Sequence, residues 1–255
     1  MLKVIICILA GLGAGVGTGF AGMSAAAVIS PMLITFLHMD PYMAVGIALA
    51  SDVLASAASA VTYARNRNLD IRNGVIMMVS VLAFTLVGSG VASLVPQTTM
   101  GNFSVFMTLL LGIKFIVKPV TAPKQRFAQA TGRQKAIRSI IGGSVVGFIC
   151  GFIGAGGGMM MLLVLTSILG YELKTAVGTS VFIMSATALT GSVSHFVIGG
   201  MPDVEALILC VISTLAFAQI SSFFANKASP KVLNRVTGGI LVALGTAILA
   251  VSRFA

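Results

Sequence analysis

Two glycine-rich stretches, GLGAGVGTGFAGM at residues 11–23 and GFICGFIGAGGGMM at residues 147–160, decide how this chain folds. They lie inside two overlong apolar segments, Leu2–Leu37 and Ile137–Leu169. As one helix, a segment of that length would extend about 50 Å at about 1.5 Å per residue. The hydrocarbon core of a bilayer is only about 30 Å thick. Because glycine costs about 1 kcal/mol per helical position relative to alanine, we expect each segment to unwind within its glycines, at Gly11–Gly19 and Gly154–Gly158.

The composition requires lipid as the solvent. Of the 255 residues, 57% are hydrophobic and 9% are charged, and the mean hydropathy is +1.06. A soluble domain carries about 25% charged residues, so this chain cannot cover itself with a polar surface. Four long runs contain no Asp, Glu, Lys or Arg: Val4–Met39, Val75–Ile113, Ser139–Tyr171 and Thr175–Pro202. Because period-2 alternation is absent, these runs predict membrane-spanning helices and exclude a β-barrel pattern.

The positive charge, +10 in total, is concentrated in short connections between apolar segments. The basic residues are Arg65, Arg67 and Arg72, then six between Lys118 and Arg138, then Lys227, Lys231 and Arg235. This is the distribution of cytoplasmic loops in a membrane protein. The lipid bilayer is therefore the expected partner of this chain, and nucleic acid is not.

The sequence repeats itself at an offset of 132 residues. Gly15 aligns with Gly147, Gly22 with Gly154, and Ala44-Val45-Gly46 with Ala176-Val177-Gly178. We interpret this as a duplication, with a first transmembrane repeat at 1–117, a basic cytoplasmic linker at 118–136 and a second repeat at 137–255. The remaining segments are expected at Tyr42–Ala64, Gly74–Val95, Gly101–Val117, Leu173–Ile198, Val204–Ala225 and Val232–Val251.

The predicted fold is thus an all-α polytopic membrane protein of two tandem homologous repeats. Each repeat has four hydrophobic segments, the first of them broken or re-entrant, which gives eight long segments and up to ten helices. If every segment crosses once, 12 of the 16 Lys and Arg residues lie inside. If each broken segment enters and returns, the repeats are inverted, both termini lie outside, and 14 lie inside, leaving Lys3 and Arg253. The positive-inside rule favours the inverted arrangement.

Paired, glycine-interrupted segments are the best indication of a transporter binding site in a sequence. A broken helix presents free amide groups and a positive dipole end, and these attract an anion. The second half-helices are expected to begin near Gly22-Met23-Ser24 and Gly156-Gly157-Gly158. The residues expected to bind a small anionic substrate are Thr18, Gly19, Gly22, Met23, Ser24, Gly154, Ala155, Gly156, Gly157, Gly158, Ser51, Thr179, Ser180 and Gln219. The alternative is close helix packing, because Gly11, Gly15 and Gly19 are spaced four residues apart.

Two titratable residues lie inside predicted spans. Asp52 is the one acid deep within a segment, where a charge costs at least about 2.5–3.5 kcal/mol on insertion scales. His195 titrates in the range that suits a proton relay. We consider both as candidates for proton coupling, against structural hydrogen bonding as the alternative for each.

The remaining motifs predict no chemistry. Gly17–Gly22 matches GxGxxG, but no strand–turn–helix unit surrounds it. No catalytic constellation, P-loop or metal-ligand spacing is present, so we expect no enzyme activity, no cofactor and no metal. Abundant small residues are compatible with a homodimer.

The chain resembles the sulfite exporter TauE/SafE family of membrane permeases. The resemblance rests on GTGFAGM from Gly17, GFIGAGGGMM from Gly151, the Ala44–Ala48 and Ala176–Ser180 stretches, and SHFVIGG from Ser194. It implies a multi-pass protein of the bacterial cytoplasmic membrane that moves small sulfur oxyanions or organosulfonates, such as sulfite or sulfoacetate. We therefore expect a secondary transporter with alternating access. A passive anion channel, a permease for another small organic anion and a non-transporting scaffold are the alternatives.

Overall fold

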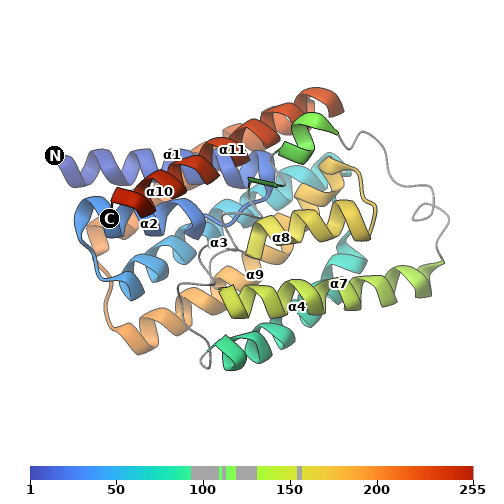
Figure 1. Cartoon of the computed structure of the whole chain (residues 1–255), viewed down its shortest axis with the longest axis horizontal. Coiled ribbons are helices and arrows are strands. Elements are labelled where there is room, and N and C mark those ends of the chain that lie inside the picture. Colours follow the sequence, from blue (N-terminus) through green and yellow to red (C-terminus); the bar gives the residue numbers. More distant parts are fainter. Residues whose placement is uncertain (93–108, 111–112, 119–130, 154–156, 255) are drawn as a thin grey trace.

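The computed structural model describes residues 1–92, 109–110, 113–118, 131–153 and 157–254, which form helices and their connections with no strand among them. The first half contains α1 (Leu2–Ala21), α2 (Ala26–Leu37), α3 (Pro41–Arg65) and α4 (Ile71–Ala92). The second half contains α7 (Gly132–Ile153), α8 (Gly157–Leu163), the π-helical turn η1 (Val164–Ile168), α9 (Leu173–Gly199), α10 (Val204–Lys227) and α11 (Pro230–Phe254). The long helices run roughly along the long axis of the molecule, and α1 begins at the end where α11 finishes (Figure 1).

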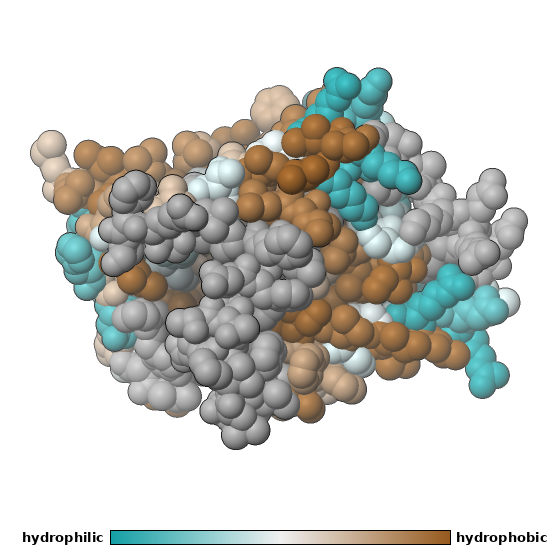
Figure 2. Space-filling model, viewed as in Figure 1, coloured by the Kyte–Doolittle hydropathy of each residue, from teal (hydrophilic) through white to brown (hydrophobic). Residues whose placement is uncertain are grey.

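Helix length and surface composition agree with a membrane location. Within the described residues, four helices are long and apolar enough to span a bilayer: Leu2–Ala21, Met43–Arg65, Leu173–Val197 and Val204–Lys227. Large apolar side chains lie on the outside, among them Leu86 and Val197, each 78% exposed. Figure 2 shows apolar residues along the body of the molecule and hydrophilic residues gathered toward its ends. This is the surface expected where lipid surrounds the middle and water covers the ends.

The first overlong segment is broken, as predicted, but the position of the break differs. The expected unwinding within Gly11–Gly19 is wrong, because α1 remains helical through all these glycines and ends at Ala21. The break comprises Gly22, Met23, Ser24 and Ala25, after which α2 begins at Ala26. Gly22 has φ 59°, a left-handed conformation that glycine adopts without steric cost and that commonly ends a helix.

The glycines of α1 serve helix packing against α10. A methyl group on Gly15 would lie 2.6 Å from the carbonyl oxygen of Thr214 and 2.7 Å from the backbone nitrogen of Ala218. Glycine is a weak helix former in water, where an unwound backbone is hydrated. In lipid the unwound backbone has no such partner, so the helix persists and the missing side chain allows the second backbone to approach.

The second overlong segment is also divided. Helix α7 continues through Gly142, Gly143 and Gly147, where it packs closely on α4, and ends at Ile153. Helix α8 begins at Gly157, so Gly157 and Gly158 are helical and not unwound. Residues Gly154, Ala155 and Gly156 lie outside the described residues, as does most of the segment predicted at Gly101–Val117. Helix α7 begins at Gly132, five residues before the predicted start of this segment.

The connections between the helices fall at two ends of the bundle. At one end, the Lys3 ammonium contacts Asp203, so the start of α1 lies beside the start of α10. At the other end, Asn68 donates to the Asn226 side chain and Tyr171 donates to Asp70. The α3–α4 loop, the start of α9 and the end of α10 therefore meet at one end, opposite the start of α1.

The packing of α1 on α10 predicts that Gly15→Ala destabilises the protein. The added methyl group meets backbone atoms that cannot turn aside, and such overpacking costs about 1–3 kcal/mol. We expect the melting temperature in detergent to fall by about 2–10 °C. The control is Gly239→Ala on α11, an exposed helical glycine where an added methyl group meets no atom of another described helix within 4 Å, and which should leave the melting temperature unchanged or slightly raised. Equal melting temperatures for Gly15→Ala and the wild type would contradict this account.

Candidate functional site

The break between α1 and α2 exposes carbonyl groups inside the bundle, and hydroxyl side chains satisfy them. The Tyr63 hydroxyl on α3 donates to the Gly19 carbonyl (2.8 Å), and Ser180 on α9 donates to the Gly22 carbonyl (2.9 Å). Thr237 on α11 donates to the Phe20 carbonyl (3.0 Å). Within the segment itself, Thr18 donates to the Met23 carbonyl (3.0 Å). Three neighbouring helices thus supply the donors that the end of α1 lacks.

The other side of the break is the N-terminus of α2, which presents amide donors. The first amides of a helix lack the usual intrahelical acceptors, and here Ala27 donates to the Ser24 carbonyl and Val28 to the Ala25 carbonyl, both at 3.1 Å. The Ala26 amide donates to the Ser24 hydroxyl oxygen at 3.3 Å. The Ala25 amide and the Ser24 side chain lie next to the Asp52 carboxyl of α3. An acidic group is therefore placed at the positive end of the α2 dipole.

Asp52 is fully buried. One carboxyl oxygen accepts a hydrogen bond from the Ser56 hydroxyl at 2.6 Å, one helical turn further along α3. The other, Oδ2, has no partner that meets hydrogen-bond geometry within the described part of the chain. Three buried hydroxyl oxygens share this property there: those of Ser30, Ser59 and Thr214. They lie on α2, α3 and α10, respectively.

The structure distributes the other predicted site residues over two regions. Ser51 donates to the Ile47 carbonyl of its own helix, and Gln219 accepts from Thr62 between α10 and α3. Thr179 accepts from the Asp70 amide at the end opposite Lys3. His195 lies on α9 beside Gly46 of α3, away from the break. The structure therefore brings Thr18, Gly19, Gly22, Met23, Ser24, Ser180 and Asp52 together. The hydroxyls of Ser51 and Thr179, which neighbour Asp52 and Ser180 in the sequence, bond outside this group. Gln219 bonds Thr62, and His195 lies beside Gly46.

Tyr63, Thr237 and Ser221 were not among the predicted site residues. Ser221 of α10 donates to the Gly15 carbonyl at 2.9 Å, and all three side chains thus bond α1 carbonyls across helices. The signal for them is general: a buried tyrosine hydroxyl requires a partner, and a helix that ends inside lipid requires donors for its last carbonyls. Sequence does not show which carbonyl each hydroxyl meets.

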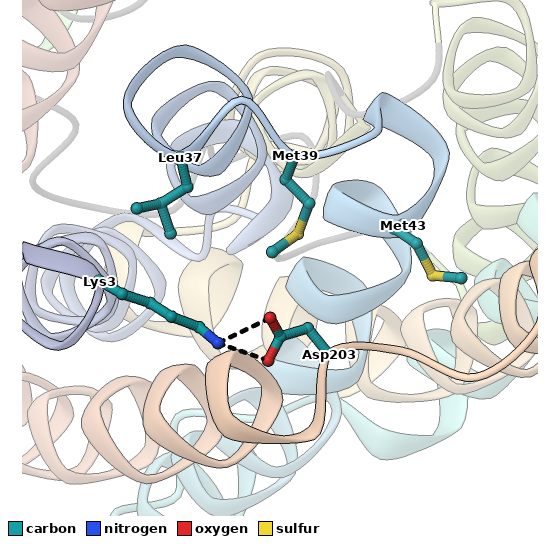
Figure 3. Close-up of a pocket in the computed structure, with 5 residues that line it drawn as sticks. All are labelled: Lys3, Leu37, Met39, Met43 and Asp203. Carbon is teal, nitrogen blue, oxygen red and sulfur yellow. Dashed lines mark hydrogen bonds and ion pairs between the residues drawn. The ribbon is translucent and has the colours of Figure 1, made fainter.

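An open cavity of about 310 Å³ lies at the Lys3 end of the bundle. Figure 3 shows its lining, in which the Lys3 ammonium meets the Asp203 carboxylate, Met39 points toward this pair, and Leu37 and Met43 complete the wall. Lys3 bonds Asp203 at 2.7 and 2.8 Å and Glu205 at 2.8 Å. The hydrogen bond from Lys3 lowers the pKa of the Asp203 carboxyl. Met43, in the cavity lining, precedes Asp52 by nine residues on α3. The cavity therefore lies about 13 Å along the helix from the Asp52 carboxyl.

The opposite end of the bundle is filled by a polar network. Tyr171 donates to Asp70 at 2.8 Å, Asn68 donates to Asn226 at 2.7 Å, and Lys174 donates to the Asn226 carbonyl at 2.7 Å. Burial and the neighbouring Asp70 carboxylate raise the pKa of Tyr171. These bonds join the α3–α4 loop to α9 and α10.

The described residues do not form the ligand set of a metal site. Among the residues that the structure describes, no group of three His, Cys, Asp or Glu side chains could hold a metal ion. Cys7 and Cys210 are buried free thiols that face each other between α1 and α10.

Comparison with known proteins places the chain in a family. A family description, "Sulfite exporter TauE/SafE", matches residues 7–248. The chain is 27% identical over 228 residues to the "Probable membrane transporter protein YunE" of Bacillus subtilis (strain 168), covering 82% of this chain and 84% of that protein. It is 22% identical over 219 residues to the "Probable membrane transporter protein YdhB" of the same organism, covering 86% and 89%. The chain therefore belongs to the TauE/SafE sulfite exporter family of multi-pass membrane transporters.

Proposed function

We propose that this protein is a secondary transporter that moves a small sulfur oxyanion or organosulfonate, such as sulfite or sulfoacetate, across the bacterial cytoplasmic membrane. The substrate binds at the break between α1 and α2. One observation carries the proposal: at this break the carbonyls are covered by hydroxyl donors, whereas the amide end of α2 faces an acidic group.

The hydrogen bonds already made by the backbone carbonyls at the break favour an anion over a cation as the substrate. A cation site inside a membrane uses bare carbonyl oxygens, as unwound helices of sodium-coupled transporters do. Here the carbonyls of Gly19, Phe20, Gly22 and Met23 already accept hydrogen bonds. The dipole of α2 remains, together with the Ala25 amide beside Asp52, and the N-terminal end of a helix stabilises negative charge.

The helix bounds support the duplication into repeats 1–117 and 137–255 joined by the linker 118–136. Helix α3 begins at Pro41 and α9 at Leu173, at the offset of 132, and the chain folds back in the second repeat as in the first, since Gly142 of α7 lies against Val164. Each repeat thereby contains one divided segment. In this proposal the second half-site, at Gly154, Ala155, Gly156, Gly157 and Gly158, completes the binding site from the other repeat.

The contacts between connections support the inverted topology. If every segment crossed once, Asn68 would lie on the opposite membrane face from Tyr171 and Asn226. The hydrogen bonds Asn68–Asn226 and Tyr171–Asp70 instead bring these connections to one end. We propose that this basic end is cytoplasmic and that the Lys3 end, with its cavity, faces outward. The polar network would then close the inner side, and alternating access would break it as the outer cavity closes.

Proton coupling is part of the proposal. Asp52 carries it, because its carboxyl lies at the proposed binding site and is buried. The role of His195 is secondary, since it lies beside Gly46 and not at the break.

The inverted topology predicts opposite labelling of two single cysteines. In a variant with Cys7, Cys150 and Cys210 replaced by alanine, we expect Met201→Cys to react with a membrane-impermeant maleimide in intact cells. Met201 is 86% exposed and connects α9 to α10 at the Lys3 end. Ser229→Cys, between α10 and α11, should react only after permeabilisation. The reverse labelling pattern would support eight single crossings and would contradict the inversion.

The proposed site predicts that Ser24→Leu abolishes transport. The larger side chain covers the amide end of α2, so sulfite and sulfoacetate flux into proteoliposomes should fall at least about tenfold while membrane insertion is retained. The control is Thr246→Leu, because Thr246 is exposed on α11 and its hydroxyl bonds only to its own helix. Flux equal to wild type in Ser24→Leu would remove the break from the transport pathway. Flux through the wild type that neither saturates nor responds to a pH gradient would instead support a passive channel.

A further inference from the structure

The anion site of the proposed function already contains a negative group of the protein. The Asp52 carboxyl lies beside the Ala25 amide and the Ser24 side chain, at the end of α2 that would hold a substrate. Its Oδ2 atom has no partner of hydrogen-bond geometry among the described residues, although the residue is fully buried. An unpaired carboxylate oxygen in this environment is costly, so its position at a helix N-terminus calls for a role.

We infer that the Asp52 carboxylate occupies the amide end of α2 in place of the substrate, and that a sulfonate binds there only after Asp52 has taken up a proton. The inference rests on the proposed function, since it concerns the same site. Both groups present oxygen atoms that accept from the same donors. Two negative charges side by side in a medium of low dielectric repel each other strongly, so the site holds either the ionised carboxylate or the bound anion.

No positive side chain in the described structure neutralises Asp52. The groups that act on its carboxyl are the Ser56 and Ser24 side chains and the Ala25 amide, all uncharged. The titratable groups on the surrounding helices have other partners or positions. Tyr63 bonds Gly19, and Lys3 bonds Asp203 and Glu205. Cys7 and Cys210 face each other, and His195 lies beside Gly46. The amide end of α2 is therefore what stabilises the ionised form.

A stoichiometry follows from this exchange. When a singly charged anion binds, one proton from water joins the Asp52 carboxylate, and the site as a whole gains no net charge. The protonated carboxyl then releases the Ala25 amide to the substrate. When the anion leaves on the other side of the membrane, the proton leaves with it. Proton and anion therefore move in the same direction, and acid on one side accelerates movement of the anion away from that side.

The test uses the purified full chain and isethionate, a sulfonate whose charge stays at −1 from pH 5 to 9. For the wild type we expect the Kd to rise up to tenfold for each pH unit above the titration of Asp52. Asp52→Asn, which mimics the neutral carboxyl, should bind isethionate with a Kd that does not change with pH. In weakly buffered solution the wild type should take up about one proton per bound anion at high pH, and Asp52→Asn none.

Two further variants control for altered folding. Asp52→Glu retains a carboxyl and should retain the pH dependence. Asp40→Asn makes the same chemical change at the exposed start of α3, where the side chain accepts from the Met43 amide, and should behave as the wild type. In proteoliposomes with acid outside, isethionate uptake by the wild type should be faster than at equal pH, whereas Asp52→Asn should show no acceleration.

Three results would overturn the inference. The same pH dependence in Asp52→Asn and the wild type would remove Asp52 from the exchange. Loss of binding at every pH in Asp52→Asn alone would show that the carboxyl holds the substrate and does not compete with it. Lack of isethionate, sulfite or sulfoacetate binding by the wild type at any pH would overturn the proposed function and this inference with it.

Discussion

A backbone group without a hydrogen-bond partner is too costly to leave in lipid, and this constraint governs how the first segment can be broken. The break at Gly22–Ala25 removes the intrahelical partners of several carbonyls. The structure supplies substitutes from outside: Tyr63 from α3, Ser180 from α9 and Thr237 from α11. Each of these side chains ties α1 to another helix, so the break also serves as the point where the bundle is joined. The break that we propose as the substrate site therefore also contributes to the fold.

Small residues also stabilise the bundle, because they allow helices to approach until side-chain hydroxyls can reach neighbouring backbones. Gly15 lets α10 come so close that Ser221 donates to the Gly15 carbonyl at 2.9 Å. Gly143 plays the matching role between α7 and α4, where a methyl group would lie 2.7 Å from the Met77 carbonyl oxygen. Between lipid-embedded helices there is little hydrophobic driving force, so this close contact and its hydrogen bonds are what hold the pairs together.

The sequence was sufficient for the helical class, for the two divided segments and for the start of each half-helix to within a few residues. Segment length decides that a break exists, because 36 residues from Leu2 to Leu37 exceed the bilayer. The position of the break depends on tertiary contacts that length does not contain. Helix propensities measured in water predicted that the chain unwinds within Gly11–Gly19. In the structure α10 packs on these glycines, and they remain helical. The hydroxyl donors at the break were partly predicted, as Thr18 and Ser180, but Tyr63 and Thr237 come from helices whose register against α1 is invisible in a sequence.

Asp52 matters for both the fold and the proposed mechanism, because the positive N-terminus of α2 needs a negative charge beside it. If the site were empty and Asp52 were absent, the dipole of α2 would point into the buried interior of the bundle with no negative charge to stabilise it. The ionised carboxylate supplies the missing negative charge while no substrate is bound. A bound sulfonate supplies it instead, and the proton then keeps the two from being charged together. Coupling in this scheme needs no long-range signal, because the ionised carboxylate and the anion compete for the Ala25 amide, and the proton decides which of them holds it.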